Sequence, residues 1–114
     1  VGGTVTITTG QSNTKTAATH DIAAGAGDTQ NVRAGSVDLT IDGDLTNNNG
    51  VTLQINSSAV VATDVVVACT ATNGSGVDAF VHLVAAGSFR ITLINRSGST
   101  IDDDTVIKIN WTAL

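Results

Sequence analysis

Two groups of aspartates have the residue types best suited to hold a metal ion. Residues 102–104 are three consecutive aspartates, and Asp38, Asp42 and Asp44 precede Thr46 and Asn48. Ca²⁺ accepts several carboxylate oxygens from one loop, but the second group has its glycine in the wrong place and lacks a closing Glu. A solvated hairpin loop is the favoured interpretation of residues 102–104, with calcium binding as its alternative. We therefore predict no metal site and no cofactor.

The nucleophiles and bases of the chain form no recognisable catalytic set. His20 and His82 are far apart, and neither has another His or Cys at a metal-ligand spacing. No Gly-x-Ser-x-Gly segment and no glycine-rich phosphate loop are present. His82 lies between Val81 and Leu83, which favours a hydrogen-bonded strand histidine or an interface contact. The sequence therefore predicts a protein that is not an enzyme.

Two further features have a functional and a structural interpretation. Trp111 could stack on a sugar, because indole faces bind ligands well. Its spacing from Ile107 and Ile109 places it on their side of a strand, which favours the core or a subunit interface. Asn95-Arg96-Ser97 matches the glycosylation pattern, but such matches arise by chance in a chain rich in Asn, Ser and Thr.

The composition predicts one domain with an aliphatic core. The chain has 114 residues, of which 41% are hydrophobic but only 3% aromatic. Such a core buries less area per residue, so we expect marginal stability in the monomer and stabilisation by subunit association. Ten acidic and five basic residues give a net charge of −5. A chain without clustered Lys and Arg is unsuited to nucleic acid.

Alternating apolar and polar residues predict an all-β fold. The expected strands in the second half of the chain cover residues 62–72, 76–86, 87–96 and 104–114. Two earlier alternating runs, residues 36–42 and 51–56, flank Asn49-Gly50, a strong turn signal, and predict a hairpin. The fold class is an antiparallel β-sandwich of about seven or eight strands, Ig-like or jelly-roll-like.

Two details of the strand over residues 62–72 predict its surroundings. Residues 65–67 are three consecutive valines, which indicates a strand covered on both sides, in a sandwich interior or at a subunit interface. Cys69 lies between Ala68 and Thr70 and is predicted to be a small buried residue. As the only cysteine it forms no internal disulfide. The chain also shows no secretory signal and no apolar run of bilayer length, so we expect folding in a reducing cytoplasm and no membrane partner.

The first 33 residues differ from the rest of the chain. Val5 and Ile7 alternate with threonines in one short strand-like run, and residues 11–29 are poor in large apolar side chains. We predict an N-terminal arm over residues 1–33, followed by a sandwich domain over residues 34–114. Val5, Ile7 and His20 are the expected arm contacts.

Open strand edges predict an assembly. The chain has no proline and few lysines to protect the edges of its sheets, so we expect copies of the chain to cover them, most plausibly as a trimer. Phe80, His82 and Val84 alternate along one strand and are predicted to line the subunit interface together with Trp111.

Residues 55–111 resemble the C-terminal part of tailed-bacteriophage virion proteins. The shared segments are Asn56-Ser57, TDVVV at 63–67, AGSFRIT at 86–92, Asn95-Arg96, residues 104–106 and a final apolar strand. The pattern is similar to that of capsid decoration proteins and of the tips of tail fibres and knobs. The resemblance implies a β-sandwich packed around a three-fold axis at the virion surface.

The expected function is therefore that of a capsid decoration, or cement, protein. It would be made in the host cytoplasm, bind the major capsid protein or other virion proteins on the outer head surface, and stabilise the shell as a homo-oligomer. The alternative is a receptor- or carbohydrate-binding tip of a tail fibre, with residues 73–76 and 97–103 as binding loops. An extracellular adhesin module is a third, less favoured interpretation.

Overall fold

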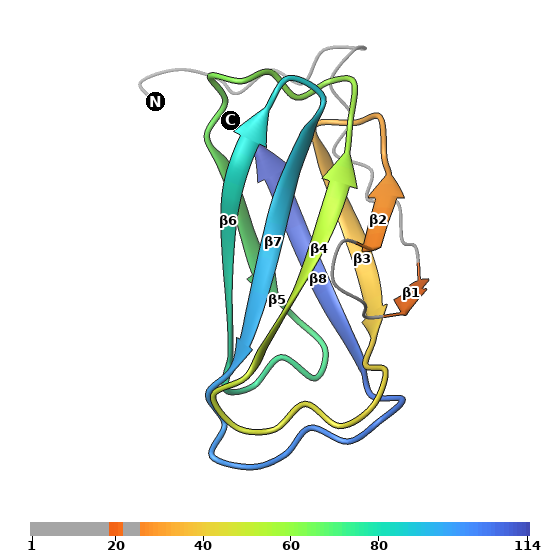
Figure 1. The fold of residues 1–114 in the computed structure, drawn as a ribbon. Coiled ribbons are helices and arrows are strands. Elements are labelled where there is room, and N and C mark those ends of the chain that lie inside the picture. The colour runs from red at the N-terminus through yellow and green to blue at the C-terminus, as the bar shows by residue number, and fades with distance from the viewer. Residues whose placement is uncertain (1–18, 22–25) are drawn as a thin grey trace.

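A computed structural model describes residues 19–21 and 26–114, which form strands and connecting loops without a helix (Figure 1). In this part of the chain no helix is long and apolar enough to cross a membrane. The predicted all-β class is confirmed. The strands are β1 (Thr19–Asp21), β2 (Ala26–Thr29), β3 (Ala34–Thr40), β4 (Gly50–Asn56), β5 (Val66–Thr70), β6 (Val77–Ala85), β7 (Ser88–Asn95) and β8 (Val106–Ala113).

The strands form two four-stranded sheets that pack face to face. Sheet A has the order β1-β3-β8-β5, and sheet B has the order β2-β4-β7-β6. The pairs β3/β8, β4/β7, β5/β8 and β6/β7 are antiparallel. Strands β3 to β6 alternate between the sheets along the chain, and β6 and β7 are joined within sheet B by residues 86–87, where Gly87 has φ +85°.

The predicted hairpin between residues 36–42 and 51–56 is wrong. These residues form β3 and β4, which lie in different sheets, each paired with strands from the C-terminal half. The connection, residues 41–49, passes from one sheet to the other, and its Leu45 is buried and bridged to Ile101. Asn48 has φ +66° and completes a turn inside this connection, so the Asn-Gly signal marks a turn that does not join paired strands.

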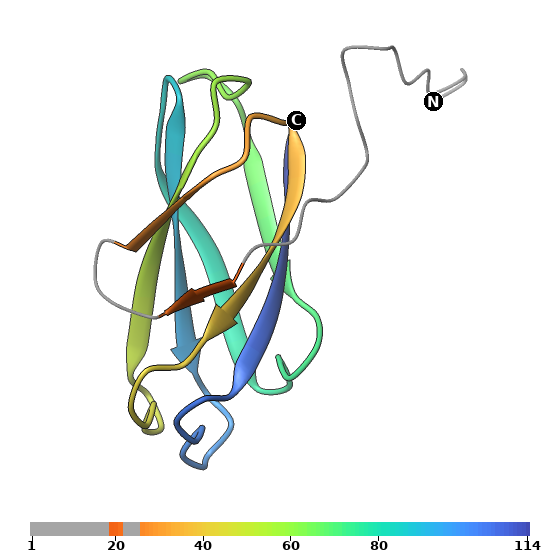
Figure 2. The same ribbon diagram turned by 90° about the vertical axis from the view of Figure 1, so that its right-hand side faces the viewer.

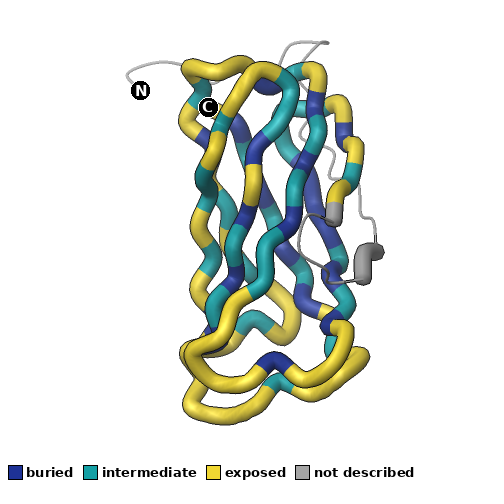
Figure 3. Tube along the Cα trace, in the orientation of Figure 1, coloured by how far each residue is buried: buried dark blue, intermediate teal, exposed yellow. Residues whose placement is uncertain are grey.

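The alternating pattern did predict the core. Phe89, Ile91 and Leu93 of β7 are fully buried, whereas Arg90 points to solvent. Figure 3 shows this alternation along the central strands of both sheets. The aromatic pair Phe89 and Trp111 meets in a T-shaped contact with ring centroids 4.9 Å apart. Side chains from both sheets therefore interlock in one aliphatic core around a single aromatic contact.

A buried glutamine closes the core beside Trp111. Gln30 is only 3% exposed, and its Oε1 accepts a hydrogen bond of 3.1 Å from Trp111 Nε1. Its Nε2 donates to the backbone oxygen of Ser36 and to Asp28, each at 2.6 Å. Gly35 lies against this group, where a Cβ would come within 2.0 Å of Gln30 Oε1. The indole N–H is therefore satisfied inside the core, as a buried donor requires.

The two short strands near the N-terminus cover one side of the molecule. β1 runs parallel to β3 and β2 runs parallel to β4, so they pair with the edges of those two strands (Figure 2). Both lie within the segment predicted as an arm. Of the expected arm contacts, Val5 and Ile7 fall outside the described residues, and His20 is described only as a backbone position of β1.

Candidate interaction surface

Strands β5 and β6 form the opposite side of the molecule and are edge strands of their sheets. β5 is the last strand of sheet A and β6 the last strand of sheet B, and they lie next to each other (Figure 1). Among the described residues, no further strand pairs with either edge. A shallow groove of about 430 Å³ follows the two edges, with a lining that includes Ala68, Thr70, Ala79 and Phe80. We call this surface the open side.

The hydrogen-bond register shows which backbone groups of β5 point away from β8. The N–H of Ala71 donates to the oxygen of Lys108, and the N–H of Leu114 donates to the oxygen of Val65. Residues at odd positions therefore bond to β8, because hydrogen-bonded pairs alternate along an antiparallel ladder. The N–H and C=O groups of Val66 and Ala68 point away from β8, toward the open side. A strand edge of this kind is a template for another strand.

Exposed apolar side chains lie on or beside the two edge strands. Among the described residues, the exposed large apolar side chains are those of Val61, Val65, Val67, Phe80, Leu83, Val106 and Leu114. Val65 and Val67 lie on the outer face of sheet A, where the N–H of Leu114 donates to the oxygen of Val65, and Phe80 lies on the outer face of sheet B. Exposed apolar side chains beside an open strand edge add apolar area to any contact made through that edge.

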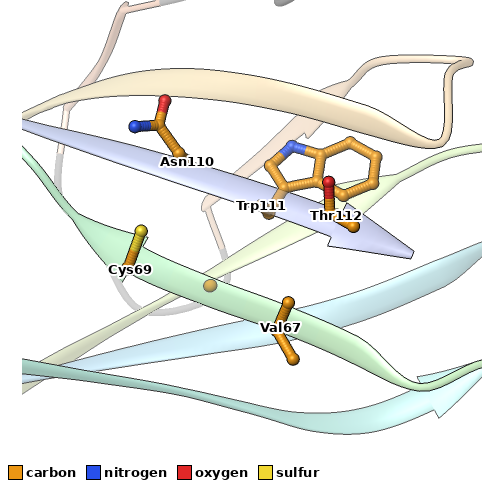
Figure 4. Close-up of a pocket in the computed structure, with 6 residues that line it drawn as sticks. Val67, Cys69, Asn110, Trp111 and Thr112 are labelled. Carbon is orange, nitrogen blue, oxygen red and sulfur yellow. The ribbon is translucent and has the colours of Figure 1, made fainter. Parts of the chain in front are cut away.

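The predicted burial of Cys69 is wrong for the single chain, and the valine run at residues 65–67 does not lie in the sandwich interior, while its placement at a subunit interface stays a prediction. Cys69 is exposed rather than buried, and Val65 and Val67 are 61% and 49% exposed. Only Val66 and Ala68 face the core, because side chains alternate between the two faces of a strand. Val67 and Cys69 instead border a shallow depression of about 220 Å³ between β5 and β8, beside Asn110 and Thr112 (Figure 4).

The loop before β5 is held by an ion pair. Arg33 donates from Nη1 and Nη2 to the two carboxylate oxygens of Asp64, each at 3.1 Å, and from Nη1 to the oxygen of Ala59 at 2.7 Å. The Arg33 hydrogen bonds, with one from the backbone N–H of Val61, hold the pKa of Asp64 below the ordinary value of an aspartate. The bidentate pair fixes the position at which the chain enters β5.

Strand β6 changes face at a bulge. The register of β6 with β7 shifts between His82 and Ala85, and Leu83 adopts φ +52°. Phe80 and His82 share the outer face, with ring centroids 6.2 Å apart, but Val84 packs against the core. The predicted alternation of all three residues on one face is therefore wrong, because the bulge reverses the side-chain direction.

His82 belongs to a hydrogen-bonded row across sheet B. Its Nε2 lies 2.7 Å from Oγ1 of Thr92, which lies 2.9 Å from Oγ1 of Thr52. The three residues come from β6, β7 and β4. His82 is thus a satisfied strand histidine, and this structure does not test its predicted interface role. Trp111 is 2% exposed, so the core interpretation holds in the single chain and the indole presents no face to a sugar.

The aspartates predicted as a calcium alternative lie in loops at one end of the molecule. Gly43 N donates to Asp103 Oδ1 at 2.7 Å, and Asp103 N donates to Asp44 Oδ1 at 3.0 Å. These carboxylates cap backbone N–H groups of the neighbouring loop. No group of three or more His, Cys, Asp or Glu side chains positioned to hold a metal ion occurs in the described ranges.

Asn95 organises the same loops and was not recognised as a structural residue from the sequence. It is fully buried, and its Nδ2 donates to the oxygens of Leu45 at 2.9 Å and Ser99 at 2.7 Å. Its Oδ1 accepts from the N–H and the hydroxyl of Ser97, at 3.0 and 2.7 Å. The Asn-x-Ser pattern at residues 95–97 therefore forms an Asx turn.

Comparisons with known proteins found no matching protein-family model, no matching curated protein and no matching solved structure.

Proposed function

We propose that this chain is a non-enzymatic structural protein of a tailed-bacteriophage virion, which decorates the outer head surface as a homo-oligomer. The observation that carries the proposal is the open side, where exposed valines and leucines lie on or beside two strand edges that no other described strand covers. Burying such a surface between copies supplies the apolar area that a core with few aromatics lacks. Several copies at one symmetry axis would convert weak single contacts into firm attachment.

The order of the strands supports a jelly-roll-like fold. β3 pairs with β8, and β4 pairs with β7. In the sequence β5 and β6 lie between these pairs, and in the sheets they form the edges opposite β1 and β2. This nested arrangement, with successive strands in alternate sheets, is typical of jelly rolls, which include viral capsid domains. Because one fold serves many functions, the topology supports the virion setting only by analogy.

The virion placement is tested by cryo-EM of the particle that carries the chain. We expect density for the two-sheet domain at repeated positions on the head lattice, in contact with the capsid protein. Density confined to tail fibres refutes head decoration. Association is tested separately by light scattering of the purified chain, and a monomer at all concentrations up to the millimolar range refutes homo-oligomerisation.

A fibre-tip binding domain is the second candidate, because the two proposed binding loops lie together. Arg96 N donates to the oxygen of Gly76 at 2.7 Å, and a Cβ on Gly76 would come within 2.7 Å of the Cα of Ser97. Residues 73–76 and 97–103 thus present polar groups at one end of the molecule. Glycan or cell binding that disappears when both loops are shortened supports this function; unchanged binding, or none in the intact chain, contradicts it.

A further inference from the structure

We propose that two copies of this chain join through β5, antiparallel across a two-fold axis, so that the two copies of sheet A become one continuous sheet. The inference depends on the homo-oligomerisation proposed above and names its contact. β5 is the longer of the two end strands of sheet A, because β1 at the other end has only three residues.

The backbone of β5 is self-complementary for this pairing. The N–H and C=O groups that point away from β8 belong to alternate residues, Val66 and Ala68, which is the spacing of hydrogen-bonded pairs in an antiparallel ladder. Two identical strands that pair antiparallel are related by a two-fold axis, so each copy gives and receives the same contacts and the assembly closes. Both edges are then satisfied at once.

The charge distribution favours β5 over β6 as the self-contact. Residues 65–77 contain no charged side chain, although the chain carries a net charge of −5. Asp64, next to β5, is neutralised by Arg33. Copies of an acidic protein therefore approach through β5 without like-charge contacts. β6 is less suited, because it carries the exposed Asp78 and its ladder is interrupted by the bulge at Leu83.

The contact through β5 is smaller than a standard interface. The five residues of β5 extend about 17 Å at roughly 3.3 Å per residue. Two sheets about 10 Å apart, with their side chains, make this side about 20 Å wide. The contact then covers roughly 340 Å² per copy, below the about 800 Å² per partner of a standard interface, so we expect a dimer that dissociates on dilution. The exposed Val65 and Val67 lie on β5 or next to it and add apolar area to the contact.

The contact is tested by sedimentation equilibrium with matched lysine variants. We expect the unaltered chain to reach twice the mass of one chain, and Val67→Lys to weaken the dimer at least tenfold, since a charge at an edge opposes pairing. Val106→Lys is the control, because Val106 is also an exposed valine of sheet A but lies outside β5. It should dimerise as the unaltered chain does. Far-ultraviolet circular dichroism shows whether each variant is folded.

Disulfide trapping identifies the register. Side chains at odd positions of β5 would face one another in non-hydrogen-bonded pairs, whose Cα atoms are about 4.5 Å apart, within disulfide range. The three central registers place Cys69 opposite Cys69, Val67 or Val65 of the second copy. Oxidation of the unaltered chain, Val67→Cys and Val65→Cys samples all three. Ser99→Cys with Cys69→Ala, at an exposed loop position, is the control and should stay uncross-linked.

Each outcome decides between the proposals. Rapid cross-linking in one of the three registers, together with dimer loss in Val67→Lys, supports the β5 contact. A trimer overturns the two-fold contact but leaves homo-oligomerisation standing, whereas a monomer at every concentration overturns both. A dimer that is unaffected by Val67→Lys also overturns the β5 contact. If Cys69 instead cross-links with Ile7→Cys, the β5 pairing is wrong and the edge is assigned to the N-terminal segment, of the same copy if the product has the mass of one chain and of a second copy if it has twice that mass.

Discussion

Replacing Asn95 by alanine is expected to destabilise the fold strongly, although the residue sits at the end of a strand beside exposed loops. Its side chain makes four hydrogen bonds that join residues 41–49 to residues 96–105. At about 0.5–1.5 kcal/mol for each bond, the gross loss is roughly 2–6 kcal/mol. In the variant, the oxygen of Leu45 still accepts a hydrogen bond from the N–H of Ile101, and the oxygen of Ser99 still accepts one from the Ser97 hydroxyl. These two carbonyl groups are therefore not left without a hydrogen bond.

We therefore expect the free energy of unfolding to fall by about 2–4 kcal/mol, a large part of the roughly 5–15 kcal/mol of an ordinary domain. The assay is urea denaturation followed by the fluorescence of the single, buried Trp111, in the Val67→Lys background to limit association. Asn47→Ala is the control, because it removes one exposed hydrogen bond, which Asn47 Oδ1 accepts from Gly98 N. A loss below about 0.5 kcal/mol for Asn95→Ala, the range of ordinary surface changes, would falsify this account of the loops.

The stability of the variant Asn95→Asp is expected to depend on pH, which gives a second test of the buried position of this side chain. The new carboxylate oxygen would face the two carbonyl oxygens that now accept from Nδ2, which opposes ionisation and raises the folded-state pKa above the unfolded value of about 3.9. The variant is then least impaired below about pH 3.9 and loses stability relative to the unaltered chain as the pH rises through the folded-state pKa. A deficit that does not change with pH contradicts the buried position of this side chain.

Three further predictions concern single residues. Leu83→Gly should stabilise the folded monomer by about 0.5–1 kcal/mol in urea denaturation, because leucine is strained at φ +52° and little burial is lost; no gain would argue against strain there. Gln30→Leu should cost about 1–3 kcal/mol by leaving the buried N–H of Trp111 without its acceptor, and an unchanged urea midpoint would contradict this. The lowered pKa of Asp64 stabilises the fold above the unfolded pKa, and this contribution is lost as pH falls through the folded pKa. The advantage of the unaltered chain over Asp64→Asn should therefore begin to shrink below about pH 3.8 and disappear below the folded pKa, and an advantage that does not change with pH would contradict this.

The sequence predicted the strands and the core because both depend on local alternation. The four strands expected over residues 62–114 are present as β5 to β8, with only the first markedly shorter than predicted. Phe89, Ile91 and Leu93 are buried because a strand with one face on the core repeats every two residues. Trp111 follows the same rule in β8.

Local sequence patterns could not predict which distant strands pair with each other. Asn49-Gly50 correctly marks a change of direction, but whether the next strand joins the same sheet depends on β7 and β8, some 40 to 60 residues later in the chain. The buried Leu45 is the one local sign of a crossing between sheets, since the tip of a two-stranded hairpin has no core to contact. The bulge at Leu83 was equally hidden, because leucine gives no sign of a positive φ.

The sequence prediction for β5 and its exposure in the structure differ, and this difference indicates an apolar surface that a single chain does not bury. Residues 65–67 indicate a strand covered on both faces, yet Val65 and Val67 are about half exposed or more in one copy. Burying a valine completely is worth roughly 1.5–3 kcal/mol, so two half-exposed valines leave a gain of that order unused in each copy. Pairing of β5 with a second β5 would place side chains of the second copy beside Val65 and Val67 on the outer face of the sheet, and part of their exposed surface would then be buried. If Val67→Lys and Val106→Lys associate alike, the valines of β5 lack this role, and their exposure has no explanation in self-association.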